Sequence, residues 1–201
     1  MKRLMLPFLW LLLLSFSTLT NGLTKKEREM ALTELQVSHD HLMIALHGLN
    51  EEQLNYKMNP EAWSIAECVE HLAITENGFA GMLQGLLQTP ADIGNREKVI
   101  VGDKELMTML VDRSNKVKTS EPFEPSGKFG SHEATLEAFK KGRKDKMDMV
   151  KTSDADFRNR VQELPFGTID GYQVFLLIAA HNERHVRQIE EIKTSEGFPK
   201  M

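Results

Sequence analysis

Residues 170–194 read DGYQVFLLIAAHNERHVRQIEEIKT, and this stretch decides the fold class. Its apolar residues recur at helical spacing, which predicts a long final helix over about 170–194. Six residues lie on one stripe of that helix: Val174, Ile178, His181, His185, Gln188 and Ile192. Because valine and isoleucine share the stripe with the two histidines, we expect both imidazoles to face the protein core.

His181 and His185 stand one helical turn apart, so their side chains project in the same direction and can share one metal ion. The same spacing also occurs where two histidines are merely structural or solvated, and it leaves both interpretations open. The zinc-protease pattern His-Glu-x-x-His is absent, because position 182 is asparagine and Glu183 points away from the pair. A general base of that kind is therefore not expected.

The rest of the chain favours one all-α domain. Of its 201 residues, 41% are apolar and 27% charged, which is an ordinary globular balance. Helical patterns cover about 24–49, 64–89, 103–117 and 131–151 in addition to the final helix, and no alternating strand pattern persists. The segments QTPADIGNREKVIVG and TSEPFEPSGKFGS are expected to be loops, and ELPFG to break the chain before the last helix. The predicted architecture is a four-helix bundle with additional short helical segments.

The N-terminal residues MKRLMLPFLWLLLLSFSTLTNG have the three parts of a secretory signal peptide: two cations, an uncharged apolar run, and then small and polar residues. We therefore expect a signal peptide over 1–22, a bundle domain over 23–201, and an exported protein in the periplasm or the extracellular space. An uncleaved membrane anchor is the alternative; after cleavage no membrane segment is expected. A net charge of −4 without a basic stripe argues against a nucleic-acid partner.

A third histidine strengthens the metal hypothesis. Ser64 and Glu67 have the spacing of a capping box, which predicts that a helix begins there and carries His71 two turns later. Three histidines from two bundle helices leave open positions on a metal, which is typical of a catalytic rather than a closed structural site. We expect their nearest ring nitrogens to converge within about 3–4 Å, because each would lie about 2.0–2.1 Å from zinc. The single cysteine, Cys68, is expected to be a small core residue.

Two motifs resemble the DinB-like superfamily of metal-binding four-helix bundles. The first is NPEAWSIAECVEHLAITE, in which Trp63, Ser64 and Ile65 open the helix that delivers His71. The second is PFGTIDGYQVFLLIAAHNERHVRQIEEI, which carries His181 and His185. The resemblance extends from roughly Leu32 to Ile192. It implies that His71, His181 and His185 form the metal triad, that the metal is zinc or nickel, and that the protein forms a homodimer.

The resemblance also implies a function. Some members of the superfamily use low-molecular-weight thiols in transfer or isomerisation reactions, and a three-histidine metal can lower the pKa of a bound thiol or water. Export weakens thiol transfer, because such thiols belong to the cytoplasm. The expected function is thus metal-dependent thiol S-transfer or hydrolysis of a small-molecule substrate. The alternatives are a non-catalytic metal- or ligand-binding bundle, or a bundle whose histidines are relics.

Three further residues are weaker candidates for the pocket. His39 lies on the inward stripe of the first helix and is a candidate acid or base, or a group that supports a metal ligand. The alternative is a core histidine whose hydrogen bonds are satisfied within the protein. Gln188 follows His185 by one turn and is suited to orient a ligand or a bound water. Arg184 is either a partner in an ion pair or a contact for an anionic substrate. No residue is assigned a catalytic role.

Overall fold

The computed structural model describes residues 22–115 and 118–200. Its elements, in chain order, are α1 (Lys25–Leu46), α2 (Glu51–Asn55), α3 (Ile65–Gln88), η1 (Ile93–Lys98), α4 (Asp103–Val111), η2 (Glu121–Phe123), α5 (His132–Thr152), β1 (Val161–Leu164), β2 (Gly167–Asp170) and α6 (Gly171–Lys193). Of the predicted signal peptide over 1–22, residues 1–21 lie outside the described part of the chain.

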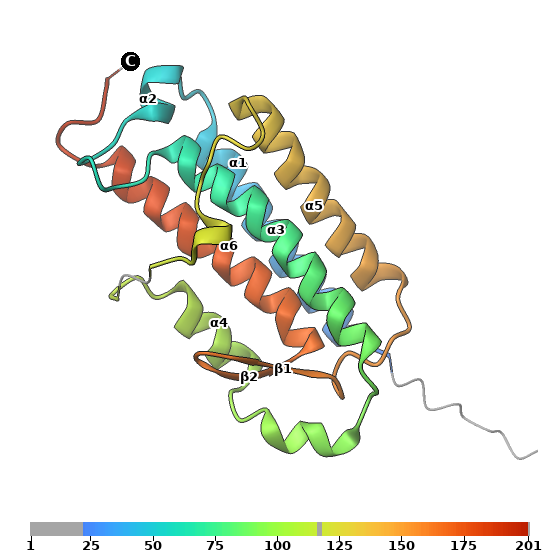
Figure 1. The fold of residues 1–201 in the computed structure, drawn as a ribbon. Coiled ribbons are helices and arrows are strands. Elements are labelled where there is room, and N and C mark those ends of the chain that lie inside the picture. Colours follow the sequence, from blue (N-terminus) through green and yellow to red (C-terminus); the bar gives the residue numbers. More distant parts are fainter. Residues whose placement is uncertain (1–21, 116–117, 201) are drawn as a thin grey trace, which may run out of the picture.

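Four long helices form the bundle predicted from the sequence (Figure 1). α1 packs against α6, α6 against α3, α3 against α5, and α5 against α1, so the helices close into a ring around one core. α4 packs on the outside of α6, and the hairpin β1–β2 lies at the end where α6 begins (Figure 1). Among the described residues, no helix combines the length and the apolar character needed to cross a membrane.

Capping side chains fix where the helices begin. The predicted capping box is confirmed: the Glu67 amide donates to Ser64 Oγ at 3.2 Å, and the Ser64 amide donates to Glu67 Oε2 at 2.7 Å. Asp170 and Gln173 form the same reciprocal pair at the start of α6. Each such cap stabilises a helix by about 1 kcal/mol and sets the register of the residues that follow it. The register of α3 and α6 in turn decides which side chains reach the bundle centre.

Several sequence predictions were wrong in detail. Residues 161–170 form an antiparallel hairpin, which the sequence conceals because each strand has only four residues and neither alternates buried and exposed positions. Residues 51–55 form the single-turn helix α2 where only a break was expected. α4 ends at Val111, short of the expected Val117, and residues 116–117 lie outside the described part.

A polar layer divides the core into two apolar clusters. One cluster gathers residues from the first half of α6 and the second half of α3, and the other gathers the remaining halves of the same helices. Between them lie buried or partly buried polar side chains from all four bundle helices: Ser38, His71, Glu76, Arg143, Lys146, His181, Asn182 and His185. The charged residues of the predicted helix over 131–151 would ordinarily lie on its outside. Arg143 and Lys146 are instead buried, because both reach the Glu76 carboxylate.

Candidate metal centre

The three predicted ligands meet in this polar layer. α3 supplies His71, and α6 supplies His181 and His185 one turn apart. One nitrogen from each ring lies within 4.8 Å of the others. His71 Nε2 and His181 Nε2 are 3.1 Å apart, within the predicted range. Three imidazoles from two adjacent bundle helices therefore surround one point.

Hydrogen bonds on the outer ring nitrogens orient two of these imidazoles. His71 Nδ1 lies 2.7 Å from the carbonyl oxygen of Phe123, and His185 Nδ1 lies 3.0 Å from Gln188 Oε1. Both partners are acceptors, so each Nδ1 carries the proton and each Nε2 keeps its lone pair. The lone pair of His71 Nε2 faces His181 Nε2 at 3.1 Å, a separation that fits two ligands of one cation. This donor set, three nitrogen atoms, suits a divalent transition metal.

Burial keeps the three rings neutral. Desolvation lowers the pKa of His71, which the Phe123 carbonyl partly offsets. The same cause, with repulsion from His71 second, lowers the pKa of His181 to about 3. Burial, followed by repulsion from His181, also holds the pKa of His185 well below its ordinary value. Because the neutral ring is the form that binds a metal, the protein holds the ligands in the binding state at neutral pH.

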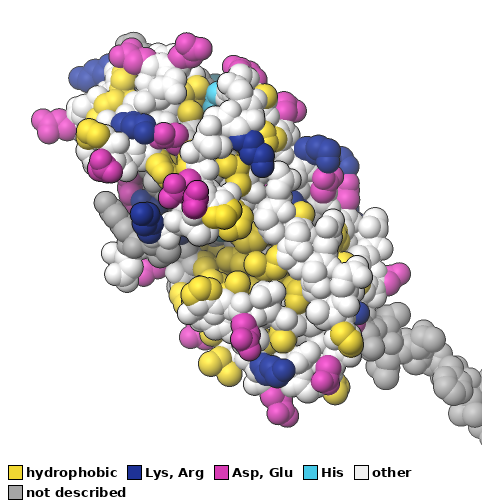
Figure 2. Space-filling model, in the orientation of Figure 1, with side chains coloured by type: hydrophobic (Ala, Val, Ile, Leu, Met, Phe, Trp, Pro, Cys, Tyr) yellow, Lys and Arg dark blue, Asp and Glu magenta, His cyan; other side chains and the backbone are white. Residues whose placement is uncertain are grey.

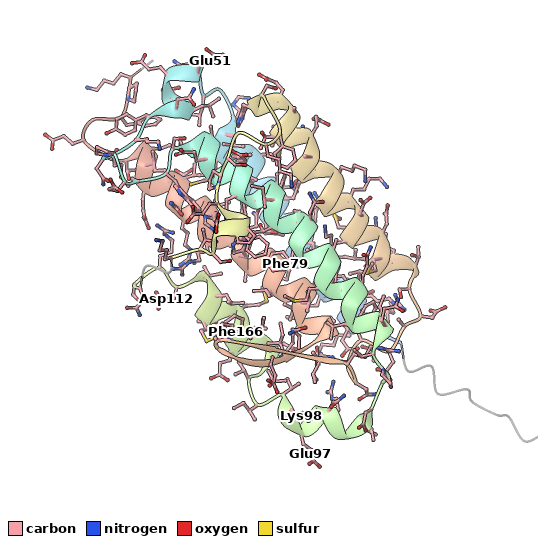
Figure 3. All side chains as sticks on the ribbon, in the orientation of Figure 1. Glu51, Phe79, Glu97, Lys98, Asp112 and Phe166 are labelled. Carbon is pink, nitrogen blue, oxygen red and sulfur yellow. The ribbon has the colours of Figure 1, made fainter. Side chains whose placement is uncertain are left out.

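Aromatic rings border the cluster. The ring centroid of Trp63 lies 4.9 Å from that of His71 and 6.2 Å from that of His185. Phe79, labelled on α3 in Figure 3, presents its ring at 5.6 Å from His181 in an edge arrangement. In Figure 2 an apolar surface crosses the middle of this face, at the level where Figure 3 labels Phe79. Such surroundings limit the access of water and strengthen electrostatic interactions inside the site.

Comparison with known proteins places this chain in a family. The sequence profile of the DinB superfamily matches residues 34–189, more than half of the chain. The protein belongs to the DinB superfamily. It is 28% identical over 149 residues to the uncharacterized protein YuaE of Bacillus subtilis (strain 168), covering 74% of this chain and 88% of YuaE.

A solved structure shares the fold of this DinB-superfamily protein. It is that of YfiT from Bacillus subtilis, described as "a probable metal-dependent hydrolase with an unusual four-helix bundle topology". The TM-score is 0.56 at 16% identity, and the match covers 89% of this chain and 92% of YfiT. At that identity the likeness establishes the fold alone.

The weaker candidates of the sequence analysis have different surroundings. Gln188 contacts one of the three clustered histidines, since its Oε1 accepts from His185 Nδ1 and, at 3.2 Å, from Arg113 Nη1. Arg184 donates to the backbone carbonyls of Asp112 and Asn115 and thus fastens the end of α4 to α6. His39 bonds Asp40 at 2.9 Å and stacks on Phe139 of α5, so the structure does not bring it to the other three histidines.

Two groups of this DinB-superfamily site were missed from the sequence. The Phe123 carbonyl is a backbone atom within an irregular segment, and a backbone acceptor has no signature in the residue types. Arg113 holds Gln188 and also pairs with Glu191 at 2.8 Å, but it lies beyond α4 in a segment where the sequence predicted more helix. Cys68 is fully buried, and burial raises the pKa of its thiol to about 12, as suits a core residue.

Proposed function

We propose that this protein is a metal-dependent hydrolase that acts on a small molecule. The observation that carries the proposal is the convergence of three neutral imidazoles whose ring nitrogens lie within 4.8 Å of one another. The description of YfiT as a probable metal-dependent hydrolase supports the same reaction class for this fold.

His71, His181 and His185 would hold the metal, and we propose zinc or nickel because both bind imidazole nitrogen well. A divalent ion with three nitrogen ligands and open positions acts as a Lewis acid and lowers the pKa of a bound water or thiol. The protein's own contribution is orientation: the Phe123 carbonyl and the Gln188 amide each fix the proton on Nδ1 of one ligand.

The surroundings also bear on the substrate. Trp63 and Phe79 flank the imidazoles, and the apolar surface of Figure 2 lies at the level of Phe79. We infer that the substrate is a small molecule with an apolar portion that packs against these rings.

A metal-binding bundle without turnover is the second candidate. It is favoured by the engagement of the two acidic side chains that flank His71 on α3. Glu70 accepts backbone hydrogen bonds from the segment after Glu124, and Glu76 pairs with Arg143 and Lys146. A carboxylate held in this way is poorly placed to accept a proton from a substrate or a water.

Metal content is the first test. Protein purified without chelators is expected to contain one equivalent of zinc or nickel, and His181→Ala is expected to lose it. His39→Ala is the matched control, because its ring lies on the α1–α5 side, and it should keep the metal. A wild-type protein that takes up neither metal, with its fold intact by circular dichroism, would refute the proposed centre.

Activity separates the candidates. A screen of ester, amide and phosphoester substrates with the metal-loaded protein, run with and without added low-molecular-weight thiols, distinguishes hydrolysis from thiol S-transfer. Turnover that requires the thiol would replace hydrolysis by transfer. Absence of turnover in a metal-loaded sample would favour the second candidate.

We further propose that residues 1–22 direct export to the periplasm or the extracellular space. N-terminal sequencing of the protein recovered from its native compartment tests this. A first residue near Leu23 is expected, and an intact Met1 would favour the membrane anchor instead.

A further inference from the structure

The connection between α4 and α5 crosses the metal-bearing helix α3. Its short helix η2 packs against α3, and Figure 1 shows this segment lying across the bundle. The Phe123 ring sits tightly on Gly78, where an added Cβ would come within 2.6 Å of the ring. This contact brings the Phe123 carbonyl to His71 Nδ1, so the connection itself supplies one of the groups that orient the metal centre.

A second attachment holds the same segment only three residues further along. The Glu70 carboxylate accepts three backbone amides: Ser126 at 3.2 Å and Lys128 at 2.7 Å on Oε1, and Gly127 at 3.0 Å on Oε2. Glu70 is only 8% exposed, so these hydrogen bonds replace most of its hydration. Gly127 has φ +74°, a conformation that favours glycine and lets three consecutive amides face one carboxylate.

Glu70 and His71 are neighbours on α3, and both form hydrogen bonds with the backbone of the α4–α5 connection. Glu70 lies more than a turn into the helix, so its carboxylate does not cap α3, whose start is capped by Ser64 and Glu67. The three hydrogen bonds from backbone amides to Glu70 fix residues 126–128. Because Phe123 lies only three residues before Ser126, this limits where the Phe123 carbonyl can lie. The orientation of His71 thus depends on a carboxylate that does not touch the imidazole.

We propose that Glu70 is a positioning residue for the metal centre. By fastening Ser126–Lys128 it holds the Phe123 carbonyl against His71 Nδ1, keeps the proton on that nitrogen, and leaves His71 Nε2 directed at the other two histidines. The proposal rests on the proposed function in taking the three histidines as a metal site. It adds that the affinity for the metal depends on the α4–α5 connection.

Glu70→Gln is the sharpest variant. Glutamine matches the shape of glutamate but offers one acceptor oxygen, so at least one of the three amides must face an NH₂ group instead. Glu67→Gln is the matched control on the same helix, because glutamine also serves at that position of a capping box. Zinc affinity is measured by competition with a chromophoric chelator. We expect Glu70→Gln to bind zinc about tenfold more weakly than wild type, as partners of ligands typically do, and Glu67→Gln to bind it equally well.

A second pair of variants tests the same dependence from the loop side. Gly127→Ala strains the turn that faces Glu70, and Gly48→Ala introduces the same strain at φ +76° in the α1–α2 connection, where a Cβ meets nothing within 4 Å. Only Gly127→Ala should weaken zinc binding. Equal zinc affinity in Glu70→Gln, Gly127→Ala and wild type, with all three folded, would overturn the proposal.

The state of the His71 ring gives a readout that does not require metal. Long-range ¹H–¹⁵N correlation spectra of the metal-free protein should show His71 protonated on Nδ1 in wild type and a mixture of tautomers in Glu70→Gln. If wild type binds no zinc, the proposed metal centre fails while this spectrum still decides the role of Glu70. An unchanged Nδ1 tautomer in Glu70→Gln would then overturn the positioning role.

Discussion

The polar layer of the bundle contains two groups of side chains that are buried alike and satisfied differently. In the first group, Glu76 accepts from Arg143 Nε at 2.8 Å and lies 3.2 Å from Lys146 Nζ. Arg143 also donates to the Leu35 carbonyl and to Ser38 Oγ, so it ties three helices together. In the second group, three neutral histidines point ring nitrogens at one another. The first group pairs opposite charges, whereas the second brings ring nitrogens of three neutral histidines to a common point.

The two groups are close neighbours along the chain, since Glu76 follows His71 by five residues on α3. Burying either group costs desolvation free energy, and only paired charges or hydrogen bonds offset that cost. The ionic group offsets part of that cost through the pairing of Glu76 with Arg143 and Lys146. The histidine group holds no charge, and its ring nitrogens are the atoms of this layer that a cation could bind.

The largest expected effect separates the two groups by stability. Arg143→Leu leaves the Glu76 carboxylate without its closest partner in the core, so we expect a loss of about 3–5 kcal/mol in the free energy of unfolding, measured by urea denaturation. Lys144→Leu, on the exposed face of the same helix, should change it by less than about 0.5 kcal/mol. If Arg143→Leu is as stable as Lys144→Leu, the ionic group does not hold the bundle together.

The next effect, counted per side chain, is the pH dependence of the metal-free protein. In the folded state the pKa values of His71, His181 and His185 are all lowered, whereas the unfolded chain binds a proton near the ordinary value of about 6.5. The unfolded state therefore binds more protons below that pH, and stability falls as the pH falls. Each histidine that stays neutral contributes about 2 kcal/mol of this loss between pH 7 and pH 5.

Urea denaturation across this pH range, with a chelator present, measures the slope. His181→Ala removes one of the three groups. Between pH 7 and pH 5 the variant should therefore lose about 2 kcal/mol less in the free energy of unfolding than wild type does. Parallel profiles would mean that His181 is protonated in the folded protein as well, and the histidine group would no longer differ from an ordinary solvated one.

The smallest effect concerns the orientation of His185. Gln188→Leu removes the acceptor of the His185 Nδ1 proton, so we expect zinc affinity to fall about tenfold while the free energy of unfolding of the metal-free protein changes little. Gln188→Glu keeps an acceptor at this position and should retain zinc binding. Unchanged zinc affinity in Gln188→Leu would show that His185 is oriented without the Gln188 side chain.

Much of the fold was predictable, because short stretches of sequence determine where its helices begin and which side of each helix is buried. The Ser64–Glu67 capping box lies within four residues, and the stripe with His181 and His185 repeats along one helix. The β1–β2 hairpin and the burial of Arg143 were missed for the opposite reason. A four-residue strand is too short to show an alternating pattern of apolar and polar residues. On a lysine-rich helix, the sequence does not distinguish a buried arginine from the exposed charged residues around it.

The candidate site divides in the same way. Periodicity placed His181 and His185 on the core-facing side of their helix, because residues three and four apart share a face whatever surrounds them. Helix packing then brought His71 Nε2 to His181 Nε2 across 110 residues of sequence, and the α4–α5 connection brought the Phe123 carbonyl to His71 across 52. The sequence by itself determined which residues could bind a metal. Only the tertiary structure decided that Nδ1 of His71 carries the proton, because its acceptor, the Phe123 carbonyl, reaches the ring only in the folded protein.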